Sequence, residues 1–162
     1  MFPAYRRSPR LPAEDYLGPL AAHVIFVARQ RRSLFSSADL ASMCLVALQE
    51  SIGSFGADLV AYCMMPNHAH LLVQIPEGVS LQDWAKRAKQ LSGFRLKRAT
   101  GDFAWQISYY DHILRREEAL IDVAKYIWAN PVTAGLFTAR ELYEWSGPRS
   151  LSRRPKGLQL RR

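Results

Sequence analysis

Hydrophobic residues gather in short runs along the first half of the chain, and their character predicts three β-strands. Residues 21–28 include His23-Val24-Ile25-Phe26-Val27, which are mostly β-branched or aromatic side chains that favour a strand. Residues 58–64 and 68–75 have the same character, and Pro66-Asn67 between them is typical of a tight turn. We therefore expect the second and third strands to form a hairpin.

Two further segments carry hydrophobic residues at helical spacing, and each begins with residues that can cap a helix. The first begins with Ser36-Ser37-Ala38-Asp39 and is predicted to run to about Phe55. The second begins with Ser80-Leu81-Gln82-Asp83 and is predicted to end near Thr100-Gly101. Its apolar stripe consists of Leu81, Trp84, Ala85, Ala88 and Leu91.

The last third of the chain predicts one more strand and one more helix. Residues 106–114 contain the aromatic and β-branched side chains of a strand. Glu117 and Glu118 then place negative charge where a helix begins, and we expect this helix to run to Asn130. Because proline disfavours a helical conformation at the residue before it, Pro131 predicts that the helix ends there.

The order strand, helix, strand, strand, helix, strand is that of a ferredoxin-like split βαβ fold. We predict an α+β sandwich with an antiparallel sheet, helices on one face and an additional C-terminal helix that carries Tyr126. A length of 162 residues is common for one domain, which we place at residues 17–150. Residues 1–16 are predicted to be a flexible basic arm, and residues 151–162 a basic tail.

Charge and cysteine content narrow the class of partner. The chain has 22 Lys and Arg residues against 14 Asp and Glu, and its net charge of +8 predicts a polyanionic partner, with solubility alone as the simpler explanation. Cys44 and Cys63 form no Cys-x-x-Cys pair and lie in apolar stretches, as expected for thiols in a reducing cytoplasm. Because no apolar run is long enough to span a bilayer, we expect a cytoplasmic protein rather than a secreted or membrane-embedded one.

The pair His68 and His70 is the first candidate for chemistry. Side chains alternate along a strand, so both imidazoles point to the same face and could hold one divalent metal ion. The simpler alternative is that they only form hydrogen bonds. Leu72 stands where metal hydrolases of the His-x-His-x-Asp-His type need an acidic residue, which argues against that class. Asn130 could add an oxygen ligand, and mixed ligation suits Mn²⁺, while Mg²⁺ is the abundant alternative.

Tyr126 is the second candidate, because it lies one predicted helical turn before Asn130 and shares a helix face with it. The apolar stripe of this helix consists of Leu120, Val123, Ala124 and Ile127, and a polar stripe beside it consists of Asp122, Tyr126 and Asn130. A tyrosine near a helix end is usually a packing residue. Beside a metal ion that activates a phosphate it could instead attack phosphorus, with Asp122 as a second candidate for ligand or proton acceptor.

Three spaced motifs are more specific than either candidate alone. They are residues 61–72, residues 105–106 with 109–112, and residues 126–136, with a weaker fourth at 143–146. In this order the pattern resembles the single-tyrosine transposases of the HUH superfamily (IS200-like), and most of all the REP-associated tyrosine transposases of bacteria. The resemblance covers most of the chain, from about His23 to Trp145.

The resemblance implies a metal-dependent DNA transposase that cleaves single-stranded or hairpin DNA through a 5′-phosphotyrosine intermediate and transfers strands. By this resemblance His68 and His70 hold the ion, Asn130 is a third polar ligand, and Tyr126 is the nucleophile. The implied partner is an imperfect palindromic hairpin. Relatives often act as dimers, so a homodimer is left open.

The sequence also departs from the resemblance at several positions. Ala69 is smaller than the residue often found between the two histidines, which should loosen packing without moving the ligands. Ala28-Arg29-Gln30-Arg31 replaces a turn that usually contains glycine, so the resemblance does not extend to the DNA contacts of this loop. His23 matches a histidine common in these relatives, and we expect both it and His112 to be packed or DNA-facing rather than metal ligands.

Basic residues predict where DNA binds. The candidates are Arg31 and Arg32 after the first strand and Lys86, Arg87, Lys89, Arg95, Lys97 and Arg98 on the second helix, with Arg6, Arg7, Arg10, Arg153, Arg154 and Lys156 near the ends. A solvated helix face is the simpler explanation, but only Asp83 and Asp102 lie nearby to balance this charge. Trp105 and Tyr109 are candidates to stack on unpaired bases.

Two functions therefore compete. One is a DNA strand-transfer enzyme, and the other is a hairpin-specific DNA-binding protein without active cleavage. The intact set of His68, His70 and Tyr126 favours the enzyme. An RNA-binding domain on the same kind of sheet is disfavoured, because its aromatic and glycine signature is missing.

Overall fold

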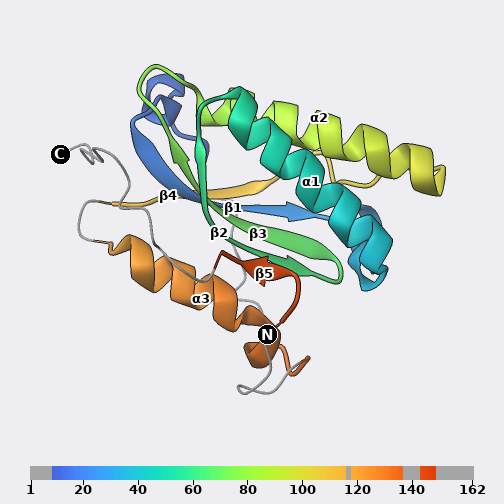
Figure 1. Ribbon diagram of the computed structural model, residues 1–162. Helices are drawn as coiled ribbons and strands as arrows, with labels where there is room; N and C mark the ends of the chain where they lie inside the picture. The colour runs from blue at the N-terminus through green and yellow to red at the C-terminus, as the bar shows by residue number, and fades with distance from the viewer. Residues whose placement is uncertain (1–8, 116–117, 137–142, 149–162) are drawn as a thin grey trace.

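A single antiparallel sheet organises the molecule. The computed structural model describes residues 9–115, 118–136 and 143–148, which form five strands in the order β4-β1-β3-β2-β5. The strands are β1 (Leu20–Val27), β2 (Asp58–Met65), β3 (His68–Ile75), β4 (Tyr110–Ile113) and β5 (Ser146–Gly147). The helices are α1 (Ala38–Ser54), α2 (Leu81–Thr100) and α3 (Leu120–Thr133), with short 3-10 helices η1 (Ala13–Tyr16), η2 (Arg29–Arg31) and η3 (Leu34–Ser36) (Figure 1).

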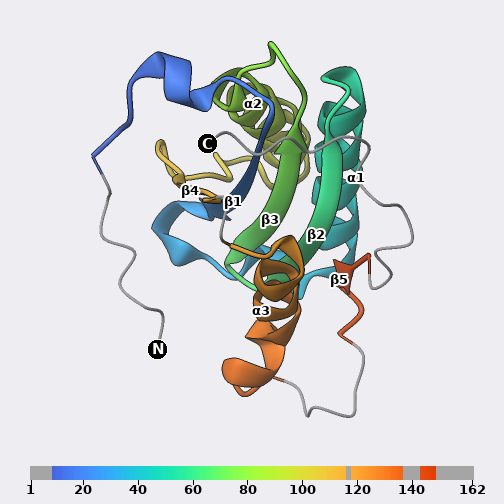
Figure 2. The same ribbon diagram turned by 90° about the vertical axis from the view of Figure 1, so that its left-hand side faces the viewer.

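The connectivity β1-α1-β2-β3-α2-β4 confirms the predicted ferredoxin-like split βαβ fold. The central strands β1 and β3 are buried along their whole length because helices cover both faces of the sheet. Helices α1 and α2 lie side by side on one face, and α3 lies on the other (Figures 1 and 2). The expectation of helices on one face is therefore right for α1 and α2 but wrong for α3.

Alternation along β3 divides its side chains between two layers. Ala69, Leu71 and Val73 belong to the apolar core beneath α1 and α2, which also contains Trp84 and Phe26. The side chains between them on β3 point toward α3. The layer beneath α1 and α2 is thus an apolar interior, whereas the layer beneath α3 combines a second apolar cluster with the buried side chains of His68 and His70.

Helices α1 and α2 begin and end close to the predicted residues, because local capping groups set their ends. The hydroxyl of Ser37, one residue after the predicted cap, accepts the N–H of Leu40 at the start of α1. The hydroxyl of Ser80 accepts the N–H of Asp83 at the start of α2, as predicted. Gly101 ends α2 with a φ of 82°, a left-handed conformation that glycine adopts without strain.

The strand predicted at residues 106–114 is shorter than expected, since β4 begins only at Tyr110. The N–H of Gln106 still donates to the carbonyl of Val27 on β1. After that point the backbone leaves the sheet, and the carbonyls of residues 106–108 accept hydrogen bonds from the ammonium group of Lys89. A side chain thus replaces the strand pairing that the residue types favoured.

Helix α3 does not end at Asn130 but continues through Pro131 to Thr133. Proline has no N–H to donate to the carbonyl of Ile127, one turn earlier. The side-chain amide of Asn130 donates to that carbonyl instead, at 3.2 Å, and Pro131 is buried in line with Ala124. Packing and one substitute hydrogen bond therefore override the local preference of the residue before proline.

The N-terminal arm is ordered earlier than expected. Residues 13–16 form η1, and Tyr16 is buried in the core with its hydroxyl accepting the N–H of Leu11. Residues 1–8 of the predicted arm lie outside the described residues, as do residues 151–162 and Glu117. Of the basic residues predicted to contact DNA, the members outside the described part are Arg6, Arg7, Arg153, Arg154 and Lys156.

Two general expectations concern the thiols and the membrane. Cys44 and Cys63 are both buried, as their apolar surroundings predicted. Among the described residues, none of the helices combines the length and the apolar character that crossing a bilayer requires.

Candidate active site

His68 and His70 occupy the first and third positions of β3, directly after the hairpin turn. Their Nε2 atoms lie 3.0 Å apart, and both side chains are almost completely buried. Two imidazole nitrogens that bind one ion at about 2.1 Å and at right angles lie about 3 Å apart. The two predicted ligand side chains therefore meet in a geometry that suits one cation.

The other ring nitrogen of each histidine is also engaged. The Nδ1 atom of His68 lies 2.7 Å from Oδ1 of Asn67, and the Nδ1 atom of His70 lies 2.9 Å from Nε2 of His23. Such contacts hold an imidazole in one orientation and favour one tautomer. The structure thus places four polar side chains in a row, from Asn67 through His68 and His70 to His23.

Burial keeps the three imidazoles neutral at neutral pH. It lowers the pKa of His23 and of His68 to about 4, with further lowering from the charge of His112 on the former and of Arg31 on the latter. The pKa of His70 lies well below its usual value of 6.5, because of burial first and of repulsion from His68 and His23 second. A neutral imidazole offers a lone pair, so these side chains can bind a cation without first losing charge.

Tyr126 lies on α3 above this row of histidines. The centre of its ring is 6.5 Å from that of His70 and 6.1 Å from that of His23, edge-on in both cases. Ala124 and Ile127 hold the helix against the sheet, while 43% of the Tyr126 surface stays exposed. The phenol therefore borders both the histidines and the solvent.

The remaining predicted ligands lie on the same helix. The side-chain nitrogen of Asn130 donates to the carbonyls of Tyr126 and Ile127, so the amide oxygen is the atom that could bind a cation. Asp122 is exposed in the first turn of α3. Across the residues that the structure describes, no three His, Cys, Asp or Glu side chains cluster as a metal site, so an amide, water or substrate must complete any shell.

His23 is packed, as expected, but the sequence analysis did not anticipate its contact with His70. The register of β1 against β3 pairs His23 with Leu72 and Ile25 with His70, so the two histidines are diagonal neighbours on one face of the sheet. Alternation alone indicated that His23 and Ile25 share a face, but not which residues of β3 they meet. His112, paired with His23 across β1 and β4, is exposed and contacts Glu118 at 2.9 Å.

Comparison with known proteins places this arrangement in a family. The profile of the family described as IS200-like transposases matches residues 18–130, a span that contains both His68 and Tyr126. The chain belongs to the IS200-like transposase family. A curated Haemophilus influenzae protein, named as a candidate REP-associated tyrosine transposase, is 28% identical over 103 residues, 55% of this chain and 57% of that protein. The match thus spans little more than half the length of this relative.

Solved structures share the IS200-like transposase fold. The structure of a REP-associated tyrosine transposase bound to a REP hairpin has a TM-score of 0.70 and 20% identity, covering 87% of this chain and 81% of that one. The crystal structure of a candidate transposase from Deinococcus radiodurans has a TM-score of 0.55 and 23% identity, covering 75% and 95%. At these identities the comparison establishes a common fold.

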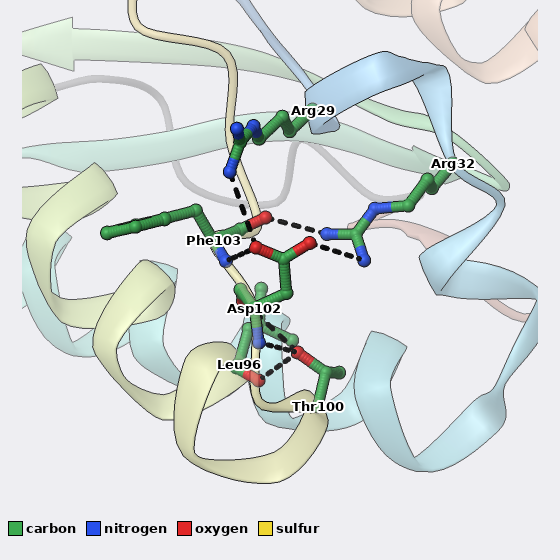
Figure 3. Close-up of polar contacts among 6 residues, drawn as sticks. All are labelled: Arg29, Arg32, Leu96, Thr100, Asp102 and Phe103. Atoms are coloured by element: carbon green, nitrogen blue, oxygen red, sulfur yellow. Dashed lines mark hydrogen bonds and ion pairs between the residues drawn. The ribbon is translucent and has the colours of Figure 1, made fainter.

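In this IS200-like transposase family member, the two predicted loop arginines have different surroundings. Arg32 donates to the carbonyl of Phe103 at 2.6 Å and pairs with Asp102, whose carboxylate also accepts from Arg29 (Figure 3). This network joins the segment after β1 to the segment after α2. Arg31 is exposed at the end of η2, and its charge acts on the neighbouring His68. Of the two, Arg31 is therefore the better candidate for contact with phosphate.

The basic residues of α2 lie across the sheet from Tyr126, because α2 and α3 cover opposite faces (Figure 2). The guanidinium of Arg95 forms an ion pair with Glu50 of α1 at 2.5 Å. The exposed members of the predicted set on α2 are Lys86, Arg87, Lys97 and Arg98. Any DNA contact made by α2 is thus on a different surface from the histidines and Tyr126.

The prediction that Lys89 contacts DNA needs a correction, because its ammonium group binds backbone carbonyls of the protein. Its ammonium group donates to the carbonyls of Gln106, Ile107 and Ser108 at 2.5, 2.9 and 3.2 Å. An ammonium group has three donors, and all three are satisfied by the backbone. We therefore withdraw Lys89 from the predicted DNA contacts and regard it as the residue that shapes the segment before β4.

The two aromatic residues that we predicted to stack on bases pack in the core instead. Trp105 is 8% exposed and packs against Phe26 in the core, and Tyr109 packs against the same ring. The exposed aromatic residues near α2 are instead Phe94 and Phe103. Aromatic enrichment in the sequence could not separate core rings from surface rings.

Proposed function

We propose that the protein is a metal-dependent DNA transposase that cleaves single-stranded or hairpin DNA through a covalent bond to Tyr126 and transfers the strand. The observation that supports this most is the place of Tyr126, whose half-exposed ring lies 6.5 Å from the buried ring of His70 in the same chain. Membership of the IS200-like transposase family supports the same class of activity. Both histidines and the tyrosine come from one chain, so the proposed site does not require a second subunit.

In the cleavage step, the phenolic oxygen of Tyr126 attacks a phosphorus atom of the DNA backbone. The bond between that phosphorus and the 3′ oxygen of the preceding nucleotide breaks. The phenolic proton passes to solvent, which reaches the exposed ring, and the departing oxygen takes up a proton. The products are a 5′ phosphate joined to Tyr126 and a free 3′ hydroxyl, and attack of a 3′ hydroxyl on this linkage joins strands again.

The histidine pair with one oxygen ligand suits a divalent ion such as Mn²⁺, and Mg²⁺ is the abundant alternative. His68 and His70 would hold it through Nε2 atoms that lie 3.0 Å apart, with the amide oxygen of Asn130 as a third ligand. When bound, the ion supplies positive charge that makes the phosphorus more electrophilic and fixes the phosphate in line with the attacking oxygen. The contacts of Asn67 and His23 to the outer ring nitrogens support this arrangement of the pair.

Hairpin DNA is the substrate class that we propose. The similar REP-associated tyrosine transposase of known structure is bound to a REP hairpin, which supports the same class of partner here. The net charge of +8 favours a nucleic acid over an uncharged substrate. Arg31 lies at the edge of the candidate site, where it can meet a phosphate that approaches Tyr126.

The test is a search for the covalent adduct. Hairpins that bind the purified protein are first selected from a pool of imperfect palindromes with single-stranded flanks. A labelled binder is then incubated with Mn²⁺ or Mg²⁺, and a denaturing gel reveals any protein joined to DNA. We expect wild type to form the adduct, Tyr126→Phe to bind the hairpin without an adduct, and EDTA to abolish the adduct.

Tyr62→Phe is the matched control, because Tyr62 lies on β2 and packs toward the other face of the sheet. It should form the adduct at the wild-type rate. Hairpin binding by wild type with no adduct in either metal would favour the DNA-binding protein without cleavage. An adduct that persists in Tyr126→Phe would show that another side chain is the nucleophile.

A further inference from the structure

His23 is the member of the histidine row that the proposed chemistry does not use. It lies on β1, is 5% exposed, and its Nε2 atom is 2.9 Å from Nδ1 of His70. We propose that His23 is a positioning residue for metal binding, which accepts a hydrogen bond from His70 and so directs the Nε2 lone pair of His70 toward the ion. This inference rests on the proposed metal site and assigns a role to a residue outside the ligand set.

The direction of the hydrogen bonds along the row follows from Asn67, which stands at the end opposite His23. The amide oxygen of Asn67 can only accept, so the Nδ1 atom of His68 carries the proton. The Nε2 atom of His68 then presents a lone pair toward Nε2 of His70, 3.0 Å away. This lone pair has two ways to be satisfied, either by a proton on His70 or by a cation.

Without a cation, His70 donates from Nε2 to His68, and its Nδ1 atom accepts from Nε2 of His23. With a cation between the two Nε2 atoms, His70 must carry its proton on Nδ1, and Nε2 of His23 must accept. One proton moves between the two nitrogens of His70 and one between those of His23, so the number of protons is unchanged. His23 therefore has to donate in one state and accept in the other through the same atom.

Few side chains can take both roles at this position. Histidine does so by changing tautomer, and glutamine can do so by presenting either its amide nitrogen or its oxygen. Leucine can do neither, and it would leave the N–H of a fully buried, metal-bound His70 without an acceptor. Partners of this kind on the outer nitrogen of a ligating histidine typically change metal affinity by about 10–100-fold.

The test measures metal binding directly, without DNA. Free Mn²⁺ is titrated into EDTA-treated protein and quantified by its EPR signal. We expect His23→Leu to raise the Mn²⁺ dissociation constant at least tenfold, and His23→Gln to bring it back to within a few-fold of wild type. Rescue by glutamine is the outcome that a purely structural role would not produce, since glutamine and leucine both fill the space.

His112→Gln is the matched control, because His112 is paired with His23 across β1 and β4 but is exposed and contacts Glu118. Its Mn²⁺ affinity should equal that of wild type. Equal affinity in His23→Leu and wild type would overturn the inference even if the adduct assay succeeds. A clear difference between leucine and glutamine would support it even if no adduct forms, so the two proposals fail separately.

A second measurement applies if His23→Leu does not fold. Long-range ¹H–¹⁵N spectra of the wild-type protein report which ring nitrogen carries each proton, with Mg²⁺ as a diamagnetic ion. We expect saturation with Mg²⁺ to move the His70 proton to Nδ1 and the His23 proton away from Nε2. A His23 ring that keeps its proton on Nε2 in the metal-loaded protein would contradict the inference.

Discussion

Gln30 and Arg31 adopt left-handed backbone conformations at the end of β1, with φ values of 55° and 52°. Such conformations cost free energy for residues other than glycine and persist only where the surroundings enforce them. Here the N–H groups of Ala28 and Phe35 donate to the carbonyls of the β2–β3 turn, each at 2.9 Å. The loop therefore stays close to His68 and presents Arg31 at the edge of the candidate site.

Replacing Gln30 by glycine tests the cost of this conformation. Glycine adopts a positive φ without a Cβ clash, so Gln30→Gly should raise the free energy of unfolding by roughly 0.5–1 kcal/mol despite the extra entropy of the unfolded chain. Urea denaturation at constant m value measures the change. The control is Gln49→Gly on the exposed face of α1, which should lower the free energy of unfolding by about 1 kcal/mol. Equal losses in both variants would contradict the assignment of strain at Gln30.

Helix α3 is the element that brings the tyrosine to the histidines, and it does so in spite of its sequence. Pro131 deprives the carbonyl of Ile127 of its helical hydrogen bond, and Asn130 supplies a side-chain donor in its place. Asn130 is therefore part of the helix backbone pairing as well as the proposed third ligand. The continuation to Thr133 keeps Tyr126 in the interior of the helix, where its position is fixed by the buried stripe.

A double-mutant cycle isolates this hydrogen bond. Asn130→Ala removes the side-chain donor, whereas Pro131→Ala restores a backbone N–H for Ile127. Asn130→Ala should therefore destabilise the wild-type background more than the Pro131→Ala background, by about 1 kcal/mol. The gain in helix propensity from alanine is the same in both backgrounds and cancels. Chemical denaturation of the four proteins gives the coupling, and a value near zero would show that the Ile127 carbonyl gains nothing from Asn130.

The whole molecule separates two surfaces on opposite faces of one sheet. The histidines contact one another and border Tyr126 on the face of the sheet that α3 covers. Helix α2, which carries the exposed basic side chains, covers the opposite face (Figures 1 and 2). Because DNA is long compared with this domain, one hairpin can meet both surfaces by passing around the edge of the sheet. The loop after β1 borders both, because the charge of Arg31 acts on His68 and the neighbouring Arg32 donates to the carbonyl of Phe103 after α2.

Charge removal on α2 tests whether that surface binds DNA. The double substitution of Lys86 and Arg87 by glutamine removes two exposed charges, and the slope of log affinity against log salt should fall by about one for every phosphate that these side chains neutralise in the wild-type complex. Hairpin affinity is measured over a range of salt concentrations by fluorescence anisotropy. Arg95→Gln is the comparison on the same helix: this guanidinium is already paired with Glu50, so its loss should change the slope less than the loss of either exposed charge. An unchanged slope in the double variant would show that Lys86 and Arg87 neutralise no phosphate in the complex.

Much of the fold could be predicted from hydrophobic patterns, which repeat every two residues in strands and every three to four residues in helices. The hairpin at Pro66-Asn67, the cap at Ser80 and the stop at Gly101 act through neighbours in the chain, so the sequence contains their physical cause. The errors occur where distant groups compete with local preference. Lys89 takes the carbonyls that would have extended β4, and packing carries α3 through Pro131.

His68 and His70 share a face because side chains alternate along a strand, and this alternation can be predicted from the sequence without knowing any partner strand. Helical spacing likewise separates Tyr126 from the apolar stripe of its helix. Three other features could not be predicted in this way: α3 lies over the histidine face, the register of β1 and β3 sets His23 against His70, and α2 points its charges away. Strand register and helix placement depend on packing between segments far apart in the chain, and no local pattern carries that information.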